Sequence, residues 1–413
     1  MLITPLKRLA TLAFCLAALH AQRGIAGAAG PDRPETVAVA VQVETDGGQT
    51  RFKITLSQAV TATAHIMERP DRVILDLPEV AFHLPSETGR RREGLIASYR
   101  YGLFAPGRSR VVMDLAQPAL VSRIDTLPHP RDGSTLLIVE LSKADRDEFH
   151  RAAAESASSL SAPVVEAAAD NPKDKRPVIM LDPGHGGVDP GAAATGGMFE
   201  KDIVFAFARM LKKKLEGEGR YRVLMTREQD VFIPLGERIR LAQRAKADLF
   251  ISIHADSIAG GQQDVRGFTV YTGSERASDA DSARLADREN QADSVAGVDT
   301  RETAAEDVSD ILRDLTTRET RAFSHNFAAR LVSELDTVAR MNKNPHRQAG
   351  FRVLRAHDTP SVLVELGYLS SRKDFDLLIS DEWRDRSAAA MTGAIDRFFA
   401  TRLARQGAAP VSP

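Results

Sequence analysis

The sequence predicts an α/β domain preceded by an all-β sandwich domain. Residues 36–145 contain short segments in which polar and apolar residues alternate, the period of a half-buried strand. From Pro177 onward, short apolar runs alternate with segments of helical spacing. Because strands that alternate with helices form mostly parallel sheets, we expect a twisted sheet with helices on both faces. A chain of 413 residues is long enough for both domains.

Two segments of the N-terminal half share one pattern. Residues 72–77 and 110–115 both begin with arginine and carry aspartate at the fifth position, and a proline follows close behind each. We interpret them as equivalent strands in the two halves of the sandwich. A chance similarity between two β segments is the alternative.

The second half begins after a change in composition. Residues 146–175 are rich in Ala, Ser, Pro, Asp and Lys, which predicts a linker with some helix at its start. The domain beyond it, at 177–402, is expected to contain an insert at 275–340 that is acidic and largely helical in pattern. The periodicity predicts strands at 178–181, 222–225, 249–253, 268–271 and 361–364, and helices at 202–216 and 235–245.

The first residues have the pattern of an export signal. Lys7 and Arg8 precede the apolar stretch 9–19, and small residues at 26–28 suit cleavage, so residues 1–28 are predicted to be a signal peptide of the general secretory path. A membrane anchor is the alternative, although the apolar run is short for a bilayer. Cys15 is the only cysteine, so the exported chain would form neither disulfides nor thiolate metal sites.

Charge and hydropathy argue against a nucleic-acid-binding protein and against a membrane-spanning protein. The net charge of −1 gives no basic field for nucleic acid. No second apolar run of spanning length follows the signal segment. We therefore expect a mature protein without a membrane span, outside the cytoplasm.

Two histidines and a glutamate are expected to meet at one edge of the predicted sheet. His185 follows the strand 178–181 in a glycine-rich turn, His254 directly follows the strand 249–253, and Glu200 opens the next helix. The carboxyl ends of parallel strands gather ligands. Two imidazoles and one carboxylate, with water in the fourth position, are the donor set of a catalytic zinc site. Singly, each residue has an ordinary structural explanation, and only the combination is specific.

Glu365 ends the strand 361–364 at the same predicted edge. A carboxylate there could move a proton from water to a leaving amine, which an amide needs because an amine anion leaves poorly. A structural ion pair with an arginine is the alternative. His325, His346 and His357 do not end clear buried strands beside glycines, and we expect them to be structural.

Four ordered motifs carry a family resemblance. They are Leu181-Asp182-Pro183-Gly184-His185-Gly186-Gly187, Glu200-Lys201-Asp202, Ser252-Ile253-His254-Ala255-Asp256 and Val364-Glu365-Leu366-Gly367-Tyr368-Leu369-Ser370. Over roughly 177–400 the chain resembles the N-acetylmuramoyl-L-alanine amidases of the zinc amidase type 3 family. The resemblance implies zinc ligation by His185, Glu200 and His254 and a catalytic role for Glu365. The family commonly has asparagine where Asp256 stands, and Thr or Ser around Leu366, but neither position is a proposed ligand.

The resemblance extends to the other segments. Residues 36–145 look like an AMIN domain, which implies targeting to peptidoglycan or the division septum; a plain structural appendage is the alternative. The insert resembles the regulatory segment of division amidases, in which Glu289 would occupy the active site as an autoinhibitory metal ligand. The partner implied is a LytM-type activator that binds the insert, where Val308, Ile311, Leu312 and Leu315 have helical spacing. Ordinary packing explains that stripe equally well.

The expected function is zinc-dependent hydrolysis of the amide between N-acetylmuramic acid and the L-alanine of the stem peptide, in septal cell-wall splitting in the periplasm. Two alternatives stay open. One is a binding protein that keeps the zinc pocket without catalysis, and the other is a zinc peptidase that cuts within the stem peptide. The sequence does not determine the oligomeric state, the activator or the preferred substrate.

Overall fold

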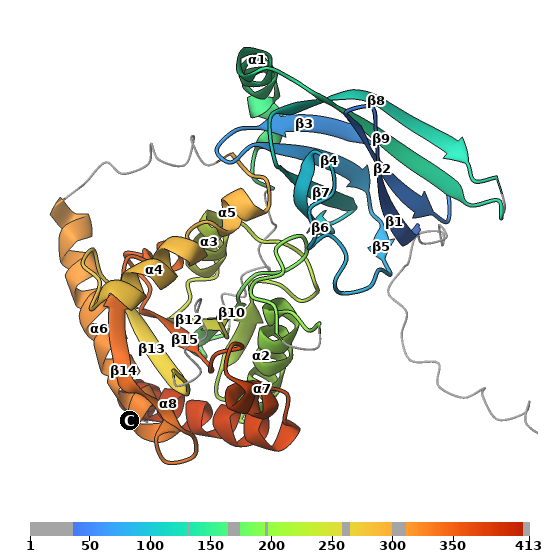
Figure 1. Cartoon of the computed structure of the whole chain (residues 1–413). Coiled ribbons are helices and arrows are strands. Elements are labelled where there is room, and N and C mark those ends of the chain that lie inside the picture. Colours follow the sequence, from blue (N-terminus) through green and yellow to red (C-terminus); the bar gives the residue numbers. More distant parts are fainter. Residues whose placement is uncertain are drawn as a thin grey trace, which may run out of the picture. The chain divides into compact units, whose positions relative to one another are not determined.

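A computed structural model describes residues 36–130, 132–163, 174–194, 197–257, 265–299 and 311–407. Nine strands come first, followed by an α/β arrangement (Figure 1). The predicted signal segment 1–28 and Val308 lie outside the described residues, as do part of the predicted linker (164–173) and part of the insert (300–310). Among the described helices, none combines the length and the apolar composition that a membrane span requires.

The N-terminal part is a sandwich of two sheets, as the sequence predicts, and their described strand pairs are antiparallel except for the parallel pair β1–β5. One sheet has the order β5-β1-β2-β9-β8 and the other β3-β4-β7-β6. Alternate residues of β2, such as Phe52 and Ile54, are fully buried against Val73 and Leu75 of the opposite sheet. The strands are β1 (Val37–Asp46), β2 (Gln49–Leu56), β3 (Thr63–Met67), β4 (Arg72–Pro78), β5 (Ala81–Phe82), β6 (Ile96–Ala105), β7 (Arg108–Leu115), β8 (Ala119–Pro128) and β9 (Thr135–Lys143). Helices α1 (Arg146–Ser156) and η1 (Ala157–Leu160) follow.

The predicted placement of the two Arg/Asp segments is wrong. They lie in β4 and β7, which are neighbours in one sheet rather than equivalents in two halves. Antiparallel pairing sets Arg72 opposite Asp114 and Asp76 opposite Arg110. The pattern is therefore self-complementary, since each strand supplies a cation where the other supplies an anion.

The second part contains one mixed sheet of order β11-β10-β12-β15-β13-β14, in which only the β13–β15 pair is antiparallel. This confirms the predicted fold class. The strands are β10 (Val178–Pro183), β11 (Arg222–Met225), β12 (Leu249–His254), β13 (Phe268–Gly273), β14 (Met341–Ala349) and β15 (Ser361–Glu365). The helices are α2 (Glu200–Gly217), α3 (Leu235–Arg244), α4 (Ala280–Glu289), α5 (Ala292–Val295), α6 (Ile311–Leu335), η3 (Arg352–Leu354), α7 (Arg372–Leu378) and α8 (Asp381–Gly407).

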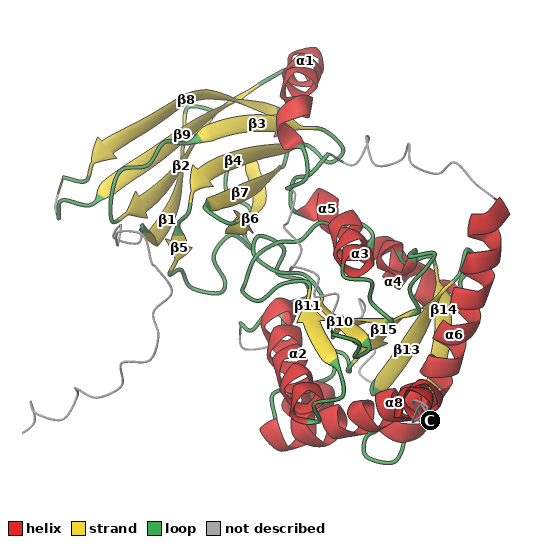
Figure 2. Ribbon diagram, turned by 180° about the vertical axis from the view of Figure 1, so that it is seen from behind, coloured by secondary structure: helices red, strands yellow, loops and turns green. Residues whose placement is uncertain are grey.

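Helices cover both faces of this sheet (Figure 2). Ile179 and Leu181 of β10 pack with residues of α2, α6 and α8. Their neighbours Val178 and Met180 point the other way, toward α3 and α4. Because successive strand residues alternate between faces, a strand such as β10, in which every residue is buried, requires a helical layer on each side.

Candidate metal centre

His185 is carried by a turn that leaves the carboxyl end of β10. Its backbone is left-handed, with φ of 58°, and Gly186 and Gly187 also have positive φ. For a residue with a Cβ this conformation costs energy, which surrounding contacts must offset. Arg238 donates to the carbonyl oxygen of His185 over 2.8 Å, and Arg227 donates to that of Gly184 over 3.0 Å. The two guanidinium groups thereby fix the shape of the turn.

A buried ion pair anchors this scaffold. Asp182 is fully buried and accepts from Arg238 over 2.8 Å, and from the hydroxyls of Thr226 and Ser252 over 2.7 Å each. Burial alone would raise the pKa of Asp182, but the charge of Arg238 and the two hydroxyls hold that pKa below its ordinary value. The carboxylate is therefore ionised, and it ties β10 to β12 and α3.

Glu200 begins α2 and is also fully buried. One carboxylate oxygen accepts from the backbone N–H of Ala192 and the other from that of Ala255, each over 2.9 Å. Burial would raise the pKa of Glu200, but His185 and His254 hold that pKa well below its ordinary range. The carboxylate is thus oriented on both sides and still faces the two imidazoles.

His254 ends β12 and completes a compact group with the other two residues. His185 Nε2 lies 3.2 Å from one oxygen of Glu200, and His254 Nδ1 lies 3.3 Å from the other. Among the described residues, this is the group of histidines and carboxylates whose ligand atoms converge as a metal site requires. In a tetrahedral zinc site, neighbouring ligand atoms are about 3.4 Å apart, a value close to these distances.

Unsatisfied atoms support the fit to a metal ion. His185 Nε2 and His254 Nδ1 are buried and make no hydrogen bond within the described chain. Buried polar atoms normally have partners, and a cation between them would supply one. The other nitrogen of His185 lies 2.9 Å from Asp189, which orients the ring as carboxylates do behind metal-binding histidines.

Two glycines keep space for the imidazoles. A Cβ added to Gly184 would lie 2.4 Å from His254 Cε1, and one added to Gly191 would lie 2.6 Å from His185 Cδ2. These close approaches explain why the turns need glycine.

Glu365 lies beside this group, because β15 pairs with β12 and sets Glu365 opposite His254. Its Oε2 accepts from the backbone N–H of Asp256 over 3.0 Å, whereas its Oε1 is buried without a partner in the described chain. Burial raises the pKa of Glu365 well above its ordinary value, and the nearby Asp256 and Glu200 raise it further. A carboxyl group with a raised pKa can hold and release a proton near neutral pH.

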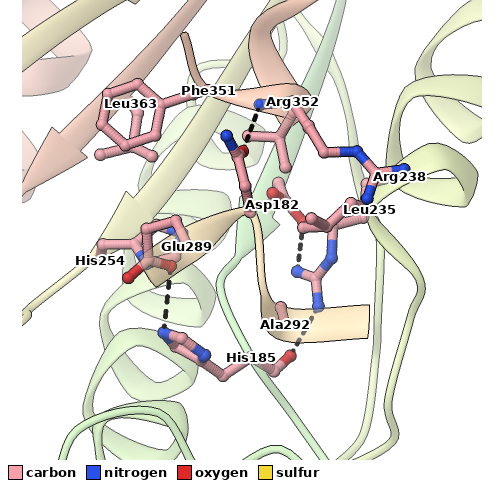
Figure 3. Close-up of a pocket in the computed structure, with 12 residues that line it drawn as sticks. Asp182, His185, Leu235, Arg238, His254, Glu289, Ala292, Phe351, Arg352 and Leu363 are labelled. Carbon is pink, nitrogen blue, oxygen red and sulfur yellow. Dashed lines mark hydrogen bonds and ion pairs between the residues drawn. The ribbon is translucent and has the colours of Figure 1, made fainter. Parts of the chain in front are cut away.

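Glu289 comes from the last turn of α4 and fills the space in front of the two histidines (Figure 3). Its Oε2 lies 3.2 Å from His254 Nδ1 and 3.6 Å from His185 Nε2. Ser282, Leu285, Ala286 and Glu289 are the buried residues of α4, so the glutamate occupies the helix face that packs against the domain. The cavity that Glu289 lines together with His185 and His254 measures about 10 Å³, which is room for about one water.

Sequence reasoning did not assign roles to several residues at this site. Asp189, Arg227 and Arg238 position the His185 turn, and the short spacing from His185 to Asp189 is a signal for the first of them in the sequence. Arg288 forms an ion pair with Asp256 beside the site. The rings of His325 and His346 contact each other in a tilted arrangement, with centroids 5.3 Å apart, outside the metal-binding group.

Comparison with known proteins gives two family matches. Residues 179–397 match the family described as N-acetylmuramoyl-L-alanine amidase, and residues 40–143 match the AMIN domain. The chain is 32% identical to the N-acetylmuramoyl-L-alanine amidase AmiC of Neisseria meningitidis serogroup B, over 87% of this chain and 89% of the relative. It is 31% identical to the AmiC amidase of Escherichia coli O6:H1, over 89% of this chain and 91% of the relative.

A solved structure, the amidase AmiC2 of Nostoc punctiforme, is 27% identical. It aligns with a TM-score of 0.39 over 54% of this chain and 97% of that one.

Proposed function

The chain belongs to the N-acetylmuramoyl-L-alanine amidase family, and from this premise we propose that it is a zinc-dependent peptidoglycan hydrolase held inactive by its own α4 helix. The family fixes the enzyme class, a hydrolase of the peptidoglycan amide bond. The bond proposed is the one between N-acetylmuramic acid and the L-alanine of the stem peptide.

The observation that carries the zinc proposal is the convergence of His185, Glu200 and His254, with two buried imidazole nitrogens that lack partners in the described chain. These three residues would hold the ion. When bound, zinc polarises the amide carbonyl and makes water a stronger nucleophile at neutral pH. Glu200 remains oriented by its two backbone donors, and Asp189 keeps the His185 ring in position.

Glu365 is the proposed proton carrier. Its Oε1 has no partner in the described chain, and β-sheet register sets the residue opposite His254, so it stands beside the reacting atoms. We expect Glu365 to accept a proton from the attacking water and to deliver it to the alanine nitrogen as the amide bond breaks. The raised pKa of Glu365 suits a group that must be reprotonated within each cycle.

Autoinhibition is proposed from the position of Glu289. Its carboxylate faces both imidazoles, where it would take the coordination position that water needs, and little volume remains for a substrate. Residues next to Glu289 hold the C-terminal end of α4 in place. Arg288 pairs with Asp256, and Asn290 bonds through its side chain to the backbone of Gly350 and Arg352, over 3.0 and 2.7 Å.

The remaining assignments extend the family resemblance. We propose that residues 1–28 direct export to the periplasm and that residues 36–145 target the enzyme to peptidoglycan at the division septum. Residues 146–175 would link them to the catalytic domain at 177–402. A LytM-type activator is proposed to bind the insert 275–340 and to withdraw Glu289 during daughter-cell separation.

Purified sacculi digested with the zinc-loaded chain, without its signal segment, test these proposals. Products are identified by mass spectrometry for the wild type, Glu289→Gln and the control Asp281→Asn, which changes an exposed acid on the same helix. We expect intact stem peptides that begin with alanine, and the largest release from Glu289→Gln. Cuts within the stem peptide would favour the zinc peptidase, and no product from any folded, zinc-loaded form would favour the binding protein. Equal release by all three forms would refute autoinhibition.

A further inference from the structure

Three arginines stand on one face of the four-stranded sheet in the N-terminal domain. They are Arg72 of β4, Arg100 of β6 and Arg110 of β7, whose side chains are 8%, 16% and 0% exposed. Asp114 pairs with the first two and Asp76 with the third. A buried guanidinium group has five N–H donors, so one carboxylate does not satisfy it.

The remaining donors reach the backbone that follows Glu289. The carbonyl oxygens of residues 294–297 accept from all three arginines. Arg72 binds the first of these carbonyls, Arg100 the second over 2.7 Å, and Arg110 the last two over 3.2 and 2.8 Å. These carbonyls lie at the carboxyl end of α5, where helix geometry leaves acceptors unpaired and where positive charge is favourable.

Apolar contacts extend the same junction. Ala296 and Val298 are 0% and 1% exposed, and they pack with Ile74, Phe104 and Val112 of the sandwich. Between them, Gly297 has φ of 71°, and a Cβ at this position would lie 2.6 Å from Ile74 Cδ1. The residues that follow α5 therefore fit this sheet face in both shape and charge.

We propose that this sheet face, defined by Arg72, Arg100 and Arg110, is the docking surface for residues 294–298, and that the N-terminal domain is thereby a component of the inhibitory device. The inference rests on the proposed autoinhibition by Glu289. Asp293 shows how the contact is transmitted, since its side chain accepts from the backbone N–H of Leu235 at the start of α3 over 2.8 Å. The short segment between Glu289 and 298 is thus held on one side by the catalytic domain and on the other by the arginines.

The test uses the full-length chain without its signal segment, loaded with zinc. Arg100→Gln weakens the docking surface, Gly297→Ala weakens its occupant, and Arg51→Gln is the control, since Arg51 pairs with Glu140 on the other sheet. Two rates are measured, zinc removal by excess EDTA and peptide release from sacculi. Arg100→Gln should raise both rates about fivefold, the factor expected from losing one ordinary hydrogen bond. Gly297→Ala, whose added Cβ would collide with Ile74, should also raise both rates. The control should match the wild type.

Two further measurements distinguish failure of the docking proposal from failure of the proposed autoinhibition. One is hydrogen exchange of residues 290–299 in each variant, and the other is the pair of rates for Glu289→Gln. If exchange rises in both docking variants while zinc removal and peptide release stay at wild-type rates, the N-terminal domain has no part in inhibition. If exchange does not rise, the sheet face is not the docking surface. If Glu289→Gln itself changes neither rate, the proposed autoinhibition fails first. Because Gly297 lies outside the sandwich, a fault in sandwich folding cannot mimic its effect.

Discussion

Replacing Asp114 with asparagine should remove an acid-sensitive part of the stability of the N-terminal domain. Asp114 accepts from Arg72 over 2.6 Å, from Arg100 over 2.7 Å and from Ser98 over 2.8 Å. Burial alone would raise the pKa of Asp114, but the hydrogen bond and charge of Arg100, with Arg72 beside it, lower that pKa from 3.8 to about 2. The folded domain therefore stabilises the ionised form of Asp114 more than the protonated form.

The magnitude follows from this pKa difference. At about 1.4 kcal/mol for each pKa unit, the change corresponds to about 2 kcal/mol of unfolding free energy. Partial exposure of the side chain, 22%, reduces the expected contribution to between about 1 and 2 kcal/mol. Because the pKa is depressed in the folded state, this stability is fully present above about pH 4 and is lost as the pH falls toward 2. Arginines left unpaired in the variant add a loss that does not depend on the titration of Asp114.

Urea unfolding of wild type and Asp114→Asn between pH 7 and pH 2.5 measures this contribution, with hydrogen exchange of β4 and β7 as the local signal. The difference in unfolding free energy between the two proteins should shrink by about 1–2 kcal/mol across the acid range. The control Asp125→Asn removes a single ion pair with Arg123, whose side chain is 66% exposed, and should change stability by less than about 0.5 kcal/mol at any pH. A difference that stays constant, or grows in acid, would refute the assignment of the low pKa.

Three further substitutions test the catalytic domain. Glu365→Gln should keep the bound zinc but lower turnover by about 10²–10⁴-fold, and near-normal turnover on sacculi would exclude Glu365 as proton carrier. Gly184→Ala should push the His254 ring aside and lower zinc affinity by at least about tenfold, measured by competition with a chelator; an unchanged affinity would contradict the close packing. Asp256→Asn removes the anion that pairs with Arg288, so basal peptide release should rise about two- to fivefold, whereas release at the wild-type rate would show that this pair does not hold α4.

The meeting of His185 and His254 was predictable because each comes at the carboxyl end of a short, mostly apolar strand. Such strands lie in the middle of a sheet, and when they pair in parallel their carboxyl ends share one edge, as β10 and β12 do. The strand β14 could not be found in this way. It lies at the end of the sheet, contains Pro345 and is largely polar, and edge strands tolerate both features.

Contacts between distant segments were beyond sequence reasoning. The arginine pattern of β4 and β7 is visible in the sequence. Nothing in that pattern shows that the remaining N–H donors bind backbone carbonyls far along the chain, such as that of Ser294, which lies 222 residues after Arg72. The same holds for Arg227 and Arg238, whose bonds to the His185 turn depend on how the strands and helices pack. Every residue has a backbone carbonyl, so residue type does not reveal which carbonyl a side-chain donor binds.

If α4 inhibits the enzyme as proposed, the contact that holds it in place is divided among several small interactions, and this division would make the inhibition reversible. The ion pair of Arg288, the amide of Asn290, the carboxylate of Asp293 and the arginine-lined sheet face each contribute on the order of 0.5–2 kcal/mol. Moving such an equilibrium from 1:99 to 99:1 requires about 5.5 kcal/mol of differential binding. An activator that binds only the open state could supply this from one well-packed helix face. Because the total is split over two domains, loss of any one contact should raise basal activity without opening the site fully.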